Sequence, residues 1–141
     1  MKILLIAAFI AIIGLPCFAQ ELDKSSDQAL SETTKLLNTP AARNAAIQKD
    51  PASRDADRKA RDLVGTKENT DEIYGLASEI FKDQTYKAKG DVKTLKAQME
   101  KASSNPEAFE NELSPEQLKR IRELASKIER QQAGLLNSNR Q

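Results

Sequence analysis

Residues 69–90 read NTDEIYGLASEIFKDQTYKAKG, and this segment has the clearest helical pattern in the chain. The large apolar residues recur at i, i+3, i+4, i+7 and i+8, which is the spacing of one helix face. These residues are Ile73, Leu76, Ala77, Ile80 and Phe81. Asn69 or Thr70 supplies an N-cap, and Gly90 stands where a left-handed residue closes a helix. The stretch therefore predicts an amphipathic helix over 70–88.

Proline marks the start of four more helices. A proline is favoured at the first helical position because its missing N–H would have no partner there, and the polar residue before it caps the first turn. The four pairs are Thr39-Pro40, Asp50-Pro51, Asn105-Pro106 and Ser114-Pro115. Apolar spacing at Val92, Leu95 and Met99 indicates one further helix. The predicted ranges are 40–49, 51–64, 91–103, 106–112 and 115–133.

The apolar pattern does not decide how the helix at 51–64 packs or why the helix at 70–88 contains a glycine. The apolar stripe of 51–64 is almost all alanine, so this helix either lies close against a neighbour or remains largely exposed. Gly75 interrupts the strongest helix, where glycine costs about 1 kcal/mol relative to alanine. A close helix crossing and plain tolerance explain this glycine equally well.

The fold class follows from these helices. No run alternates like a strand, and no Asn-Gly or Asp-Gly pair marks a hairpin. We expect an all-α protein, a compact array of about five to seven short helices after a cleaved signal peptide. The helical domain is predicted over 36–134, after a polar N-terminal arm or loose helix at 20–35 and before a frayed tail at 135–141.

The first twenty residues, MKILLIAAFIAIIGLPCFAQ, have the layout of a secretory signal peptide. Lys2 gives a positive start, an apolar run follows, and Cys17 and Ala19 place small residues before Gln20. We expect residues 1–19 to be removed between Ala19 and Gln20, and the protein to be exported to the periplasm or beyond the cell. The apolar run is shorter than the roughly 20 residues that span a bilayer, so no stable membrane insertion is expected after cleavage. An uncleaved anchor and lipid attachment at Cys17 are the alternatives.

Composition removes several classes of function. The 141 residues include no His, no Trp and a single Cys, so histidine-based catalysis, zinc fingers and disulfide frameworks lack their residues. Loss of residues 1–19 takes away Lys2 and leaves 21 basic against 21 acidic residues. A balanced charge without a basic run predicts no nucleic-acid partner. No metal site and no cofactor are expected.

Carboxylate pairs are the remaining candidates for acid–base catalysis. They are Asp55 with Asp57, Asp71 with Glu72, and Glu110 with Glu112. Each pair lies in a charge-rich segment whose spacing is typical of helix termini and solvated faces, so we expect structural roles and no catalytic residues. The sequence thus predicts a protein that is not an enzyme.

Three aromatic residues give a candidate partner-binding site: Tyr74, Phe81 and Tyr86. Tyrosine is enriched at protein interfaces, and lysines crowd the same end of the predicted helix. The alternative is that these residues form the edge of the core, with the lysines serving solubility.

Together these features predict a non-enzymatic, exported accessory or binding protein of the bacterial envelope that acts through helix-mediated protein–protein contacts. The protein partner in the envelope and the oligomeric state are not identified by the sequence. One alternative is a periplasmic helical chaperone, or holdase. The other is a secreted structural protein that self-associates through the apolar stripe from Leu118 to Ile128.

Overall fold

The computed structural model describes residues 26–138, and over this range every regular element is a helix. The all-α class is therefore confirmed for these residues. The seven helices within the described range are α3 (Ser26–Asn38), α4 (Pro40–Lys49), α5 (Pro51–Val64), α6 (Lys67–Lys87), α7 (Val92–Ser104), α8 (Pro106–Glu110) and α9 (Pro115–Ser138). The predicted signal peptide and its cleavage point at Ala19 and Gln20 lie outside the described residues.

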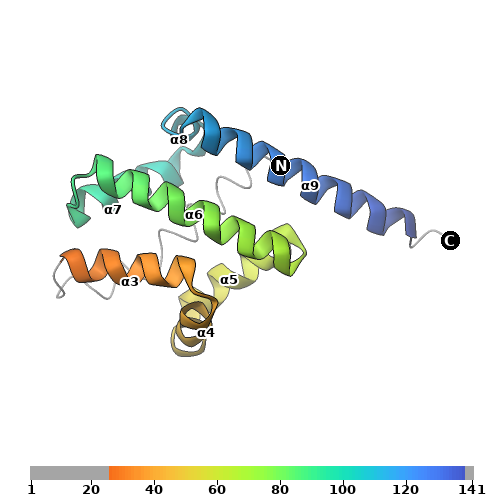
Figure 1. The fold of residues 1–141 in the computed structure, drawn as a ribbon, viewed down its shortest axis with the longest axis horizontal. Helices are drawn as coiled ribbons and strands as arrows, with labels where there is room; N and C mark the ends of the chain where they lie inside the picture. The colour runs from red at the N-terminus through yellow and green to blue at the C-terminus, as the bar shows by residue number, and fades with distance from the viewer. Residues whose placement is uncertain (1–25, 139–141) are drawn as a thin grey trace.

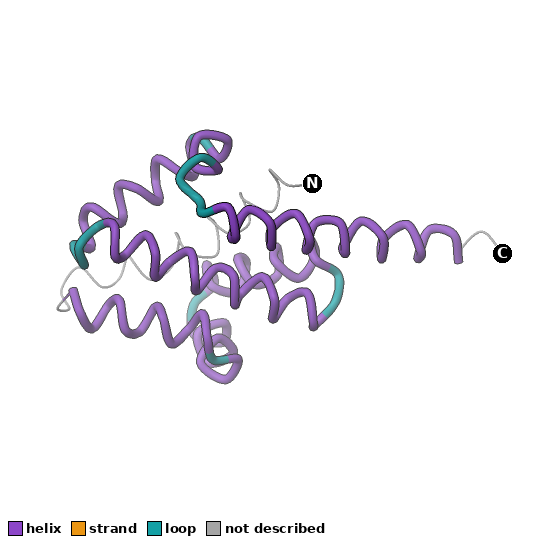
Figure 2. Tube along the Cα trace, turned by 45° about the horizontal axis from the view of Figure 1, so that its top comes forward, coloured by secondary structure: helices purple, strands orange, loops and turns teal. Residues whose placement is uncertain are grey.

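Helix α6 is the central element of the array. Helix α3 packs along one side of it and α9 along the other, each running in the opposite direction to α6 (Figures 1 and 2). Helices α4 and α5 connect α3 to the start of α6, and α7 and α8 connect the end of α6 to α9. The C-terminal part of α9 extends beyond the other helices in both views.

The core is built on the apolar stripe that the sequence identified in α6. Ile73, Leu76, Ala77, Ile80 and Phe81 are each at most 1% exposed. The stripe of α9, represented by Ile121, Leu124 and Ile128, is fully buried in the same cluster. Burial of one such large side chain contributes about 1.5–3 kcal/mol, so these two stripes contribute substantially to the stability of the fold.

Helix α3 begins inside the range predicted as a polar arm or loose helix. Its residues Ala29, Thr33 and Leu37 are buried, and the helix packs along α6. The Thr33 hydroxyl donates to the Ala29 carbonyl oxygen at 2.9 Å, so its burial leaves no unsatisfied donor. Residues 26–35 are thus an ordered part of the helical body, whereas 20–25 lie outside the described residues.

The four proline starts are confirmed, since α4, α5, α8 and α9 each begin at the predicted proline. Asp50 and Asn105 cap α5 and α8 through their side chains. Ser114 and Gln117 form a capping box: the Ser114 hydroxyl accepts from the Gln117 N–H at 3.1 Å, and the Gln117 amide oxygen accepts from the Ser114 N–H at 2.9 Å. Thr39 makes no side-chain cap, so α4 relies on the proline alone.

Two helix boundaries differ from the prediction by three residues or more, and α8 ends at Glu110 where the prediction gave 112. Helix α6 begins at Lys67 and not at residue 70, because Thr66 accepts from the Asn69 N–H and becomes the N-cap. Asn69 is already helical, and its side-chain amide donates to the Val64 carbonyl oxygen at 2.9 Å. Helix α9 continues to Ser138, past its predicted end at 133 and into the predicted tail.

Helix α6 ends in a Schellman motif with an unusual residue in the left-handed position. The Gly90 N–H donates to the Thr85 carbonyl oxygen and the Lys89 N–H to that of Tyr86, both at 3.0 Å. Lys89 has φ 53°, and Gly90 follows with φ 73°. The sequence had assigned the left-handed position to Gly90 alone, and the structure places a lysine there as well.

Candidate functional site

The three aromatic residues predicted to bind a partner do not share one surface. Tyr74 and Phe81 are buried in the core, whereas Tyr86 is 84% exposed near the C-terminal end of α6. Tyr74 and Phe81 therefore contact a partner only if the core opens. Of the three, Tyr86 alone is available on the surface.

Tyr86 lies in a shallow hollow at the end of α6. The hollow has a volume of about 690 Å³ and is lined by Lys82, Thr85, Tyr86, Lys87, Lys89 and Gly90. Lys87 is occupied, since its ammonium group pairs with Asp83 at 2.9 Å and donates to the Glu112 carbonyl oxygen at 2.8 Å. Lys82 and Lys89 form no salt bridge within residues 26–138. The end surface, defined as Lys82, Tyr86 and Lys89, thus combines one exposed aromatic ring with two uncommitted positive charges.

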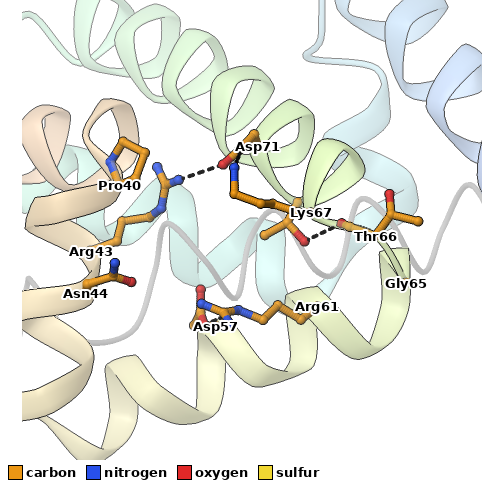
Figure 3. A pocket seen from close by; sticks show the side chains of 10 residues that line it. Pro40, Arg43, Asn44, Asp57, Arg61, Gly65, Thr66, Lys67 and Asp71 are labelled. Carbon is orange, nitrogen blue, oxygen red and sulfur yellow. Dashed lines mark hydrogen bonds and ion pairs between the residues drawn. The ribbon is translucent and has the colours of Figure 1, made fainter.

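A second site is the cleft between α4, α5 and the start of α6 (Figure 3). Its volume is about 310 Å³. The charged residues that line it are Arg43, Asp57, Arg61, Lys67 and Asp71. In Figure 3 Arg43 reaches from α4 toward Asp71 of α6, while Asp57 and Arg61 lie together on α5.

Arg43 is the residue that joins the walls of this cleft. Its guanidinium lies 4.1 Å from the centre of the Tyr74 ring, which is within the range of a cation–π interaction. One terminal nitrogen donates to the Leu37 carbonyl oxygen at 2.8 Å, and the other to Asp71 Oδ1 at 3.1 Å. With a side chain only 11% exposed, Arg43 is fixed by contacts to α3 and α6.

Asp57 is a buried carboxylate whose charge is balanced within the cleft. Tyr74 donates to its Oδ1 at 2.9 Å, and Arg61 Nε pairs with its Oδ2 at 2.7 Å. Burial of Tyr74 and, next, the negative charge of Asp57 raise the pKa of the tyrosine hydroxyl above its ordinary value, because both disfavour a second negative charge. The side chain of Asp57 is 8% exposed, so the loss of either partner would leave a charge poorly compensated.

Sequence reasoning found only part of this cleft. The pairing of Asp57 with Arg61 follows from their i, i+4 spacing, and Asp57 adjoins the alanine stripe of α5. Arg43 and Asp71 are 28 positions apart, and no local pattern connects them. The sequence left open whether the mainly alanine stripe of α5, Ala52, Ala56, Ala60 and Leu63, is packed or exposed. In the structure Ala56 and Ala60 are buried, Ala52 is exposed and Leu63 is half-buried.

The candidate carboxylate pairs have mainly cationic partners in the structure. Asp55 pairs with Arg58 at 2.8 Å on the exposed side of α5, and Glu72 pairs with Lys127 of α9 at 2.9 Å. Among the residues described, no cluster of three or more potential metal ligands is found. Within the same range no helix is long and apolar enough to cross a membrane.

No family model, curated protein or solved structure matches this chain.

Proposed function

We propose that this chain is a non-catalytic, exported binding protein of the bacterial envelope that docks a partner protein on its end surface. The observation that carries the proposal is the exposure of Tyr86, the one strongly exposed large hydrophobic side chain among those the structure describes. A tyrosine held in water gains most by burial against a partner, since its ring is apolar and its hydroxyl finds a hydrogen bond there.

The charges beside Tyr86 indicate the chemistry of the partner. Lys82 lies one helical turn before Tyr86 on α6, and Lys89 lies in the turn after the helix. Both lysines line the same hollow as the ring, so a partner that covers Tyr86 also meets them. A segment with an acidic side chain next to an apolar one complements this arrangement and would exclude basic competitors. The signal peptide predicted over 1–19, with cleavage between Ala19 and Gln20, supports a partner in the periplasm or outside the cell.

The two alternative functions receive less support. A holdase needs a broad exposed apolar surface for unfolded clients, and over the described side chains the exposed large hydrophobic is a single tyrosine. Self-association would require the apolar stripe from Leu118 to Ile128 to be available to a second copy. Ile121, Leu124 and Ile128 of that stripe are already fully buried against the rest of the monomer.

The test is co-purification from cells that produce the tagged full chain at low level, after brief crosslinking. We expect a discrete partner with the natural chain and a loss of about tenfold or more with Tyr86→Ser, as for the central residue of an interface. Lys82→Glu should also weaken capture, whereas Lys59→Glu, a matched charge reversal at an exposed lysine of α5, should not. Equal recovery of the partner with Tyr86→Ser and with the natural chain would refute the proposal. The same preparation reads the mature N-terminus, which we expect at Gln20.

A further inference from the structure

We infer that the cleft between α4, α5 and α6 is a binding site for a small oxyanion, a carboxylate or a phosphate, separate from docking at Tyr86. The inference rests on the accounting of donors and acceptors among the five charged residues that line the cleft.

The acceptors of the cleft are already in use. Asp57 accepts from Tyr74 through Oδ1 and forms an ion pair with Arg61 through Oδ2. Asp71 accepts from Arg43 through Oδ1 and from Lys67 through Oδ2, the latter at 3.0 Å. Each oxygen of both carboxylates thus has a cationic or hydroxyl partner. Neither carboxylate is left over to attract a cation.

Donors remain. Arg61 contacts Asp57 through Nε, and within the described chain its two terminal nitrogens make no hydrogen bond. Lys67 uses one of its three N–H groups on Asp71, and its side chain is mostly exposed. The Thr66 hydroxyl accepts from the Asn69 N–H, so its own hydrogen is available to a ligand. Three cations against two carboxylates leave one positive charge in excess.

One of these donors, the partly exposed Arg61, is held by an ion pair before any ligand arrives. Arg61 is anchored through Nε to a buried carboxylate, so the fork of its terminal nitrogens is oriented at lower entropic cost than that of a free arginine. A planar fork with two parallel N–H groups matches the oxygens of a carboxylate or a phosphate. The cleft volume of about 310 Å³ lies at the small end of ligand pockets, which favours a small molecule.

The test is a titration of the isotope-labelled full chain by NMR, with sodium phosphate in one arm and sodium acetate in the other, at ionic strength held constant with sodium chloride. We expect saturable shifts of the Gly65, Thr66 and Lys67 amides with a midpoint of about 1 mM or below for one of the two probes. Saturation by phosphate alone assigns a phosphate ligand, and saturation by acetate alone assigns a carboxylate; both outcomes support the site.

Matched variants separate binding from ionic screening. Lys67→Gln should weaken binding several-fold, and Arg61→Lys should also weaken it because the charge is kept while the fork is lost. Lys59→Gln, on the same helix as Arg61 but outside the cleft, should leave the midpoint unchanged. Tyr86→Ser should leave it unchanged as well, which keeps this site distinct from the docking proposal. Linear shifts without saturation for both probes, or equal midpoints for Lys67→Gln and Lys59→Gln, would overturn the inference.

Discussion

Tyr74 shows how a single side chain joins the helices around the cleft. It belongs to α6, donates to Asp57 of α5, and lies under the guanidinium of Arg43 from α4. The sequence placed Tyr74 beside the core stripe and associated it with partner binding. The structure shows a polar contact inside the core, which periodicity does not reveal because the partner, Asp57, is 17 positions away.

The substitution Tyr74→Phe should lower the free energy of unfolding by about 1.5–3 kcal/mol at neutral pH. The ring and its contact with Arg43 are kept, so the cost measures the hydrogen bond to the charged Asp57. Denaturant unfolding followed by circular dichroism measures the difference. A change below about 0.5 kcal/mol would show that water replaces the hydroxyl at Asp57 without loss.

The same pair of proteins should differ in their response to high pH. Tyr74 has a raised pKa in the folded state, whereas the unfolded chain has a tyrosine pKa of about 10. Above that pH the unfolded state loses the proton that the folded state still holds, so the contribution of Tyr74 to stability is complete below about pH 10 and falls as the pH rises further. The natural chain should therefore lose its advantage over Tyr74→Phe by up to about 1.4 kcal/mol per pH unit. A difference that stays constant from pH 8 to pH 11 would contradict this expectation.

Gly75 is the second residue whose role the structure clarifies. A Cβ added to Gly75 would meet no atom within 4 Å, and its φ is not in the left-handed region. No close helix crossing requires the glycine, so Gly75→Ala should raise the free energy of unfolding by about 1 kcal/mol through helix propensity. Gly90→Ala is the control, because Gly90 also has open space but a φ of 73°. It should destabilise, and a stabilised Gly90→Ala would show that space, and not backbone conformation, governs both sites.

The C-terminus of α6 holds a comparable feature at Lys89. A left-handed conformation raises the conformational free energy of a residue with a Cβ by about 1–2 kcal/mol, whereas glycine adopts it with little strain. Lys89→Gly should therefore stabilise the protein by about 1 kcal/mol while weakening capture of the partner. Lys89→Ala separates the two effects, since it keeps the strain and removes the charge. Thermal unfolding of the three proteins measures the first effect, and co-purification measures the second. A Lys89→Gly protein no more stable than Lys89→Ala would mean that the turn is not strained.

The helices were predictable where their determinants are local. Four helix starts are determined by two adjacent residues, a capping residue and the proline after it. The apolar stripe of α6 is recognised from the spacing of residues within that helix alone. The start of α6 was placed too late because Thr66, Asn69 and Thr70 are all competent caps, and only the Gly65 turn selects among them. The end of α9 was missed because Gly134 resembles a helix stop, whereas the helix continues through it.

Neither the cleft nor the packing of α6 against α9 was predictable, because each brings together residues from different helices. The pairs that fix α6 against α9, Arg120 with Glu79 and Lys127 with Glu72, are 41 and 55 positions apart. Sequence spacing identifies which face of each helix is apolar, but it does not say which helix covers that face. The stripe of α9 is the clearest case, since its heptad spacing fits equally well a contact within the monomer and a contact between copies.

Ile121 distinguishes these two arrangements for the whole molecule. Its side chain is 0% exposed and lies in the core cluster shared by α6 and α9. Ile121→Asp places an unpaired carboxylate in that core, which costs more than about 4 kcal/mol and should abolish cooperative unfolding of the monomer. Lys119→Asp, at an exposed position two residues away, should change stability by about 0.5 kcal/mol or less. If the stripe were instead a contact between copies, Ile121→Asp would give a folded monomer with its helicity intact. Circular dichroism together with sedimentation therefore decides whether α9 completes this core or joins one chain to the next.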